Sequence, residues 1–288
     1  MYNFNRILFW LLVCSAVTMQ SCRTISQGTF TYNADEQKRT INFGTENLLW
    51  DTGSDISLFF SPPYARKIRM GRVVTYDGAR MRHIFPVWFS HRISVDSITI
   101  KNMLYVLPPQ RKVPDAVMST NEGKRSGIIG MNVINRANWL VDFVDKTIHI
   151  IPHNGSTIEE LPVLRLSYRR SKYPRVTLIV QGIEIENVLL DTGASGDLYL
   201  PKTVLERLHR NIHPIDSGYV LSTGLYTDDI RRRIYRYTDI TVSGILLDTF
   251  TIRQAGSAYI GMGFFERFNQ LYLDTKNQEM LLYNEPVR

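Results

Sequence analysis

The chain contains two long segments that each occur twice, in the same order. ENLLWDTGSDISLFF at 46–60 returns as ENVLLDTGASGDLYL at 186–200, a shift of 140 residues without a gap. GIIGMNVINRANWL at 127–140 returns as AYIGMGFFERFNQL at 258–271, a shift of 131 residues. The nine-residue difference between the shifts indicates an insertion in the first half. Two landmarks in matched order make chance a poor explanation, so the sequence predicts a duplicated domain.

Strand-forming residues dominate both halves. Short runs of β-branched and aromatic residues, bounded by turn residues, predict strands at 39–43, 98–107, 175–190 and 240–252. Helical patterns are limited to 201–210, which opens with a proline suited to a first turn, and to the segments after Gly130 and Gly261. The sequence therefore predicts an all-β, bilobal fold. Two similar small β-barrel-like lobes are related by a pseudo-twofold axis, with few short helices.

The polar, proline-flanked segment 152–162 is the expected seam between the lobes. It divides the chain into an N-terminal lobe at 38–155 and a C-terminal lobe at 156–288. Because both lobes belong to one chain, we expect a monomer that contains its own dimer of lobes.

The first residues have the pattern of an export signal. Arg6 precedes ILFWLLVCSAVTM, a run of 13 uncharged residues that is too short to span a bilayer of about 30 Å as a helix. We therefore expect a signal peptide at 1–21 and an N-terminal tether at 22–37. The alternative is a buried N-terminal helix.

The two cysteines, Cys14 and Cys22, bear on the same point. Removal of 1–21 leaves one cysteine at the new N-terminus, which excludes an internal disulfide. This arrangement resembles bacterial lipoproteins. The resemblance implies a lipid on Cys22 and attachment to a membrane of the bacterial cell envelope, in the periplasm, the outer membrane or at the cell surface. Free secretion is the alternative.

The formal net charge is +7, and basic residues cluster at 169–172 and 231–236. A nucleic-acid-binding protein would normally add a recognisable reading module, and none is found, so no nucleic-acid partner is expected. We interpret the basic clusters as solvated loops and strand faces. The alternative is attraction to anionic lipids or acidic substrates.

The two Asp-Thr-Gly triplets carry the candidate catalytic residues, Asp51 and Asp191. Each follows an apolar run, where a carboxylate is costly unless it has a partner. If the halves pack about a pseudo-twofold axis, the two aspartates meet at their interface. Two carboxyls in contact hold one proton between them. One then activates a water as a base while the other acts as an acid toward a peptide carbonyl, without a metal or a covalent intermediate.

The neighbours of the aspartates suit this task. Gly53 and Gly193 allow a tight turn and bring a backbone N–H close to each carboxylate. The hydroxyls of Thr52 and Thr192 can bond across the interface and lock the two turns together. Ser54 completes the predicted support of the catalytic loops. The alternative for a single triplet is an ordinary β-turn, but two copies in matched contexts argue against it.

Asp-Thr-Gly followed by Ser or Ala, after an apolar strand and with a downstream apolar-apolar-Gly segment, resembles the pepsin and retropepsin clan of aspartic proteases. The resemblance covers about residues 38–285. It implies that Asp51 and Asp191 form the catalytic dyad of an aspartic endopeptidase acting on peptide or protein substrates. It also implies that 128–130 and 259–261 thread beside the catalytic loops. The short lobes look like two fused retropepsin-type units.

The family also has a hairpin flap over the substrate, often with a tyrosine near its tip. VVTYDGAR at 73–80 is similar in kind, with Tyr76 before an Asp-Gly turn signal, and GYVLSTGLY at 218–226 is its counterpart. Tyr76 is therefore the predicted flap residue, with an ordinary hairpin tyrosine as the alternative. Further candidates to line the substrate site, or to be plain core, are Phe59, Phe60, Ile128 and Tyr199.

Ser54 and its counterpart Ala194 differ in one respect that bears on pH. A hydroxyl after the triplet can donate to the carboxylate and lower its pKa. Because only the first half has one, we expect a dyad that titrates higher and activity that extends toward neutral pH. Ser195 is the alternative donor.

Other chemistries have no support in the sequence. Six histidines form no metal-binding spacing, no Cys/His cluster exists, and no Gly-x-Ser-x-Gly or phosphate-binding loop occurs, so neither a metal nor a cofactor is expected. The leading hypothesis is an exported aspartic endopeptidase. The competing one is a non-catalytic, peptide-binding lipoprotein that retains the protease fold.

Overall fold

The computed structural model describes residues 24–35, 40–43, 47–60, 67–76, 82–95, 98–108, 119–120, 123–124, 126–155, 158, 160–169, 171–223 and 229–284. The predicted signal peptide and Cys22 lie outside these residues.

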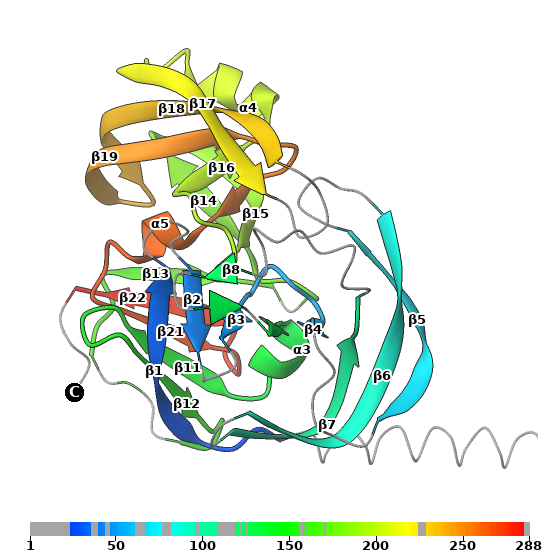
Figure 1. The fold of residues 1–288 in the computed structure, drawn as a ribbon. Coiled ribbons are helices and arrows are strands. Elements are labelled where there is room, and N and C mark those ends of the chain that lie inside the picture. Colours follow the sequence, from blue (N-terminus) through cyan, green and yellow to red (C-terminus); the bar gives the residue numbers. More distant parts are fainter. Residues whose placement is uncertain are drawn as a thin grey trace, which may run out of the picture.

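The described chain is mostly β-structure with three short helices, which confirms the predicted fold class (Figure 1). The first half contains β1 (Gly28–Asp35), β2 (Thr40–Phe43), β3 (Leu48–Trp50), β4 (Ser57–Phe59), β5 (Ile68–Tyr76), β6 (Arg82–Val95), β7 (Ile98–Val106), β8 (Ser119–Thr120), β9 (Gly123–Lys124), β10 (Gly127–Ile129), α3 (Met131–Ile134), β11 (Asn138–Asp142) and β12 (Thr147–Ile151). The second half contains β13 (Leu164–Ser167), β14 (Arg175–Val180), β15 (Ile183–Leu190), β16 (Leu198–Leu200), α4 (Lys202–Leu208), β17 (Asp216–Thr223), β18 (Asp229–Val242), β19 (Ile245–Gln254), β20 (Tyr259–Ile260), α5 (Met262–Phe265), β21 (Gln270–Asp274) and β22 (Glu279–Tyr283).

The duplication is visible in the order of the strands. Seven strands of the second half form a sheet in the order β14-β15-β20-β16-β19-β18-β17, at the top of Figure 1. The same series in the first half, β2-β3-β10-β4-β7-β6-β5, ends a 13-stranded sheet that contains strands of both halves. In both, a strand from far along the chain (β10 or β20) lies between the strand that enters an Asp-Thr-Gly loop and the strand that leaves it.

Six further strands join the halves in the order β13-β22-β21-β11-β12-β1. At the centre of this series β11 pairs antiparallel with its counterpart β21, with Leu140 opposite Tyr272. The hairpins β11–β12 and β21–β22 flank the centre, and β1 and β13 lie outside them. Antiparallel pairing of equivalent strands is what a twofold axis between them produces. The halves are therefore related by a pseudo-twofold axis.

The predicted tether at 22–37 is wrong for half of its residues. Residues 28–35 form β1, which pairs with β12 through its first four residues and with β2 through its last four. Phe30 and Tyr32 are buried, whereas Thr29 and Thr31 are exposed. This alternation is that of a half-buried strand and was present in the sequence. The predicted seam lies between β12 and β13, and the lobe boundaries stay a prediction.

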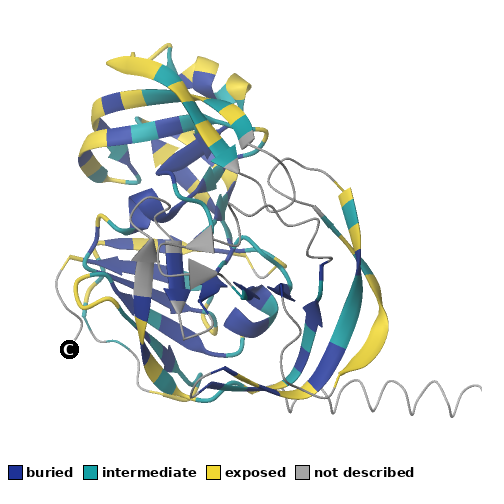
Figure 2. Ribbon diagram, viewed as in Figure 1, coloured by how far each residue is buried: buried dark blue, intermediate teal, exposed yellow. Residues whose placement is uncertain are grey.

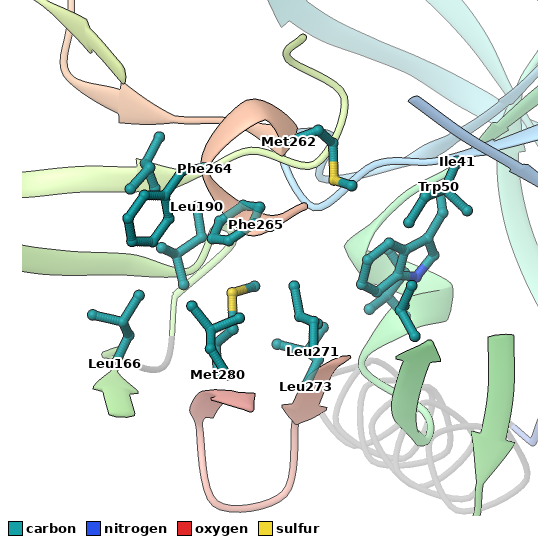
Figure 3. Close-up of a cluster of buried hydrophobic side chains, with 14 of the residues drawn as sticks. Ile41, Trp50, Leu166, Leu190, Met262, Phe264, Phe265, Leu271, Leu273 and Met280 are labelled. Atoms are coloured by element: carbon teal, nitrogen blue, oxygen red, sulfur yellow. The ribbon is translucent and has the colours of Figure 1, made fainter. Parts of the chain in front are cut away.

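One hydrophobic cluster runs through both halves. Trp50 and Leu190, the residues before the two aspartates, belong to it, and both are fully buried. Figure 3 shows Met262, Phe265 and Leu271 of the second half in the same cluster as Trp50. Figure 2 shows buried and exposed positions interleaved along β18 and β19 of the second half. Because close-packed interiors resist displacement, this shared core holds both Asp-Thr-Gly loops in place.

Candidate active site

The two Asp-Thr-Gly loops start in the same way. Asp51 follows β3 and its amide donates to the carbonyl of Ile129 at 3.1 Å. Asp191 follows β15 and its amide donates to the carbonyl of Ile260 at 2.9 Å. The central strands β10 and β20 therefore fix the point at which each loop leaves its sheet. The repeated asparagines Asn47 and Asn187, 140 residues apart, both adopt a left-handed backbone (φ 47° and 57°), which asparagine tolerates better than most residues.

The structure brings Asp51 and Asp191 together. Their carboxyl groups are hydrogen-bonded to each other. Each also lies against the glycine of the opposite loop. A Cβ on Gly53 would lie 2.4 Å from Oδ1 of Asp191, and a Cβ on Gly193 would lie 2.6 Å from Cγ of Asp51. Any side chain at either glycine would displace the carboxyl of the other half, so these two positions require glycine.

The surroundings of the dyad shift the pKa of Asp191. Burial raises the pKa of Asp191 well above its ordinary value, and the charge of Asp51 raises this pKa further. Backbone amides oppose the shift, since Gly193 donates to Oδ1 of Asp191 at 3.0 Å. The amide of Gly53 makes the equivalent bond to Oδ1 of Asp51 at 2.7 Å. Both residues keep some exposed surface. A pair of this kind holds one proton between two carboxyls.

Thr52 and Thr192 lock the two loops together. The amide of Thr52 donates to Oγ1 of Thr192 at 3.0 Å, and the amide of Thr192 donates to Oγ1 of Thr52 at 3.1 Å. Each hydroxyl in turn donates to a carbonyl of the other half, Thr52 to Leu190 at 2.6 Å and Thr192 to Trp50 at 2.9 Å. Both threonines are fully buried. The cross-interface hydroxyl bonds expected from the sequence are therefore present and symmetric.

Ser54 does not occupy the place that the sequence predicted. Its hydroxyl donates to the carbonyl of Ile56 at 2.8 Å, so its single proton is not donated to the carboxylate of Asp51. Ser195, the alternative donor, instead accepts from Nη1 of Arg253 at 3.4 Å. The absence of a hydroxyl at Ala194 therefore does not explain the raised pKa of Asp191. Its causes are burial and the charge of Asp51.

Each loop is anchored by a polar network around one buried residue, Ser57 or Asp197, that the sequence reasoning missed. In the first half, Oδ1 of Asn132 accepts from the amide and the hydroxyl of Ser57, both at 2.8 Å. In the second half, the carboxylate of Asp197 accepts from the amide and hydroxyl of Thr251 at 2.8 and 2.9 Å and from Arg267 at 3.0 Å. The repeat of Arg267 in both halves was the available signal for the second network.

The segment between β13 and β14 reaches the first-half loop. Nζ of Lys172 lies 3.8 Å from Oδ2 of Asp55. Burial and the charges of Asp55 and Asp51 raise the pKa of Tyr173 to about 12. A tyrosine of the second half thus interacts electrostatically with Asp51, and no sequence motif marked it.

The predicted flap segment at 73–80 is only partly among the described residues. β5 and β6 form an antiparallel hairpin in which Tyr76 pairs with Arg82 at the last described position. The tip and the Tyr76 side chain lie outside the described residues, so the role of Tyr76 stays a prediction. The hairpin β17–β18 is the counterpart, since Gly71 lies opposite Val87 and Gly218 opposite Ile234 at equivalent points.

The gap-free alignment of the repeated loops is wrong by one residue after the aspartates. In the first half Ile128 lies opposite Leu58, whereas in the second half Tyr259 lies opposite Tyr199. Since Ile128 and Tyr259 are equivalent, Leu58 corresponds to Tyr199. The second loop is therefore one residue longer. A one-residue shift moves a strand's side chains to the other face, so the correction changes which residues face the dyad.

Neither a metal site nor a membrane-spanning helix is found among the residues that the structure describes. No group of three or more His, Cys, Asp or Glu side chains in these residues is arranged to hold a metal ion. No helix among them is both long and apolar enough to cross a membrane.

No protein-family model and no curated protein matches this chain. Among solved structures, it is similar to the crystal structure of an aspartic proteinase from Irpex lacteus, with a TM-score of 0.49 and 12% sequence identity. The aligned region covers 90% of this chain and 97% of that one. The case for function is therefore made on the geometry of the two Asp-Thr-Gly loops.

Proposed function

We propose that this protein is an aspartic endopeptidase that hydrolyses peptide bonds with a water activated by Asp51 and Asp191. One observation carries the proposal. Two carboxyl groups from equivalent loops are hydrogen-bonded to each other, and each lies on the glycine of the opposite loop. A structural pair of aspartates would be better served by a cation between them. Two carboxyls held together without one are suited to share a proton.

The reaction needs one proton on the dyad. The ionised carboxyl takes a proton from the attacking water, while the protonated carboxyl donates a hydrogen bond to the peptide oxygen and then helps to protonate the leaving nitrogen. Because the pKa of Asp191 is raised, this singly protonated state extends to higher pH than an isolated carboxyl would allow. Activity is thus expected to extend toward neutral pH, for reasons of burial and of the charge on Asp51.

An extended segment of a peptide or protein is the substrate that suits the sheets. β5 and β17 are the outer strands of their two series, and each belongs to a hairpin equivalent to that of the other half. An extended peptide can add to such an edge by main-chain hydrogen bonds. We assign Tyr76, near the tip of the first hairpin, to the cover over the bound peptide.

The protein is proposed to act as a monomer outside the cytoplasm, anchored in the bacterial cell envelope by a lipid on Cys22. The pattern of residues 1–22 supports this part of the proposal. Mass analysis of the N-terminal peptide from exported protein tests it, since a diacylated Cys22 has a mass that free secretion cannot produce.

The test of catalysis compares wild type with Asp51→Asn and Asp191→Asn on an unstructured protein substrate between about pH 3 and pH 8. Either substitution removes a proton-transfer group, so turnover is expected to fall roughly 10²- to 10⁴-fold while the fold is retained. Asp248→Asn, at an exposed position of β19, is the matched control and leaves turnover unchanged.

The competing function, a non-catalytic peptide-binding lipoprotein, predicts a different result. Wild type would then cut nothing at any pH in this range, yet would still bind the same polypeptide. Inhibition of turnover by a statine-type transition-state mimic would further separate the two, because such a mimic binds the catalytic dyad far more tightly than a substrate does.

A further inference from the structure

The strand registers give an exact residue correspondence between the surroundings of the two aspartates. Leu58 corresponds to Tyr199, and Ile128 to Tyr259. Further out, β7 places Val106 opposite Leu58, whereas β19 places Arg253 opposite Tyr199.

The two hairpins extend this correspondence. Val87 lies opposite Val106, and Ile234 lies opposite Arg253. Two residues earlier on the same strands, Phe85 therefore corresponds to Arg232.

In the first half these positions form a small apolar cluster, called here the first-half cluster. Its buried members are Leu49, Leu58, Phe60, Phe85, Val106 and Ile128, and the partly buried Ile56, Val73 and Val87 pack against them. Leu49 lies two residues before Asp51 and so on the same face of the chain. The first-half cluster thus adjoins one carboxyl of the dyad with apolar side chains.

In the second half the equivalent positions are aromatic and cationic, and are called here the second-half cluster: Tyr199, Arg232, Arg253 and Tyr259. The rings of Tyr199 and Tyr259 stack with centroids 4.0 Å apart. Nη1 of Arg253 donates to Oη of Tyr199 at 3.0 Å, and its guanidinium lies over that ring. Arg232 is half-buried, whereas its neighbours Arg231 and Arg233 are exposed on the other face of β18. The middle arginine of the run therefore points inward.

The second-half cluster adjoins the dyad. Leu189, two residues before Asp191, lies opposite Tyr259. Nη1 of Arg253 also donates to Oγ of Ser195 in the catalytic loop at 3.4 Å. Burial, Tyr199 and Asp191 raise the pKa of Tyr259, and Arg232 and Arg253 lower it, so these groups all interact with one phenol. Any substrate residue bound beside Asp191 on this side meets the two arginines.

Arg253 has capacity for a ligand. Its Nε is buried without a hydrogen-bond partner in the described part of the chain, and none of the ion pairs found there includes this guanidinium. A guanidinium has five N–H donors in a planar fork that matches a carboxylate. Two hydroxyl oxygens, of Tyr199 and Ser195, accept from Arg253, which leaves further N–H groups of the guanidinium to bind a carboxylate.

We propose that the second-half cluster is a subsite for a substrate carboxylate, so that the enzyme cuts beside an acidic residue on the Asp191 side and an apolar residue on the Asp51 side. The inference rests on the proposed function and names its substrate class. Two sources of carboxylate fit the same chemistry, a Glu or Asp side chain and the C-terminus of a peptide. The first makes the enzyme an endopeptidase with acidic specificity, and the second makes it trim chain ends.

The experiment uses the full exported chain and matched peptides that differ only in Glu or Gln at each position beside the scissile bond. Both orders of acidic and apolar residue are included, each with a free and an amidated C-terminus. A charge-assisted pair of this kind predicts a preference for Glu over Gln of roughly 10- to 100-fold in kcat/KM near pH 6. The preference should vanish toward pH 3, where a Glu side chain of pKa about 4.3 is protonated.

Arg253→Val, which installs the first-half residue, is expected to abolish the preference, measured as the ratio of kcat/KM for the Glu and Gln peptides. Arg233→Gln removes one exposed positive charge from the same hairpin and is the matched control, with the preference unchanged. A preference that follows the C-terminal carboxylate, and is lost on amidation, assigns the subsite to chain ends.

Equal cleavage of Glu and Gln peptides by wild type, or a preference that persists in folded Arg253→Val, overturns the inference and leaves the proposed function standing. If wild type cleaves neither peptide, the proposed function fails instead. Binding of the same uncleaved peptides then decides the subsite, since tighter binding of Glu that is lost in Arg253→Val supports it and equal binding overturns it.

Discussion

The two halves of this protein are alike at the twofold axis and differ away from it. At the axis, Thr52 and Thr192 make the same pair of bonds in both directions, and each glycine receives the opposite carboxyl. Away from it, the first-half cluster is apolar, and the second-half cluster contains two arginines and two tyrosines.

The loop anchors differ as well. Neutral side chains, Ser57 and Asn132, hold the first loop, whereas an ion pair between Asp197 and Arg267 holds the second. This comparison shows which positions of the duplicated fold must be the same in both halves and which can differ. Bonds that cross the axis must satisfy both halves at once, so they stay symmetric. Groups that serve one half alone are free to diverge.

The largest expected effect breaks the anchor of the second half. Arg267→Met removes the cation from Asp197, whose side chain is only 2% exposed, and leaving a buried charge without its cation costs about 3–5 kcal/mol. Arg136→Met, at the equivalent position, is expected to cost less because Arg136 donates to the backbone carbonyls of Lys101 and Asn132. Urea unfolding measures both free energies. Equal losses would contradict the proposed difference between the anchors.

A smaller effect tests the symmetry at the axis. Thr52→Val and Thr192→Val each leave a buried amide and a buried carbonyl of the other half without a partner, at a cost of about 1–3 kcal/mol. We expect the two losses to be equal and the double variant to be non-additive, since the residues share partners. Thr→Ser at each position keeps the hydroxyl and is the control. Clearly unequal losses would show that the axis is not symmetric in energy.

The smallest effect concerns pH. The folded pKa of Asp191 is raised above its ordinary value of 3.8, so the folded state binds the proton more tightly than the unfolded chain does. Stability is therefore present at low pH and is lost as pH rises through the raised pKa. Asp191→Asn has no such loss, so its melting temperature should exceed that of wild type increasingly above pH 4. Asp248→Asn should follow wild type, and parallel curves for all three proteins would contradict the shift.

The strand segments and the short helices were predictable because their signals are local. Alternating and β-branched runs gave β7, β14, β15 and β19, and Pro201 marked the start of α4. β1 was missed although Phe30 and Tyr32 alternate with threonines, because its position next to a predicted signal favoured a tether. The interpretation of the basic cluster at 231–236 as a solvated strand face was also incomplete. Arg232 in this cluster is half-buried and points inward.

Two features of the site were not predictable for a physical reason. The Ser54 hydroxyl donates to the carbonyl of Ile56 although a carboxylate is the stronger acceptor, so the loop geometry decides the partner. The equivalence of Tyr199 depends on strand register. An alignment of the two repeats without a gap makes Tyr199 equivalent to the core residue Phe59. The strand pairing of the structure makes it equivalent to Leu58, whose side chain lies on the other face of the strand.

What the sequence by itself determined is the existence of two equivalent Asp-Thr-Gly loops in an all-β frame, because repeated letters at matched spacing report a duplication directly. Only the tertiary structure decided what surrounds each aspartate. One extra residue between Ala194 and Asp197 shifts β16 by one position, and a shift of one position exchanges the two faces of a strand. That exchange brings Tyr199 and Arg253 to the side of Asp191, opposite the apolar cluster beside Asp51.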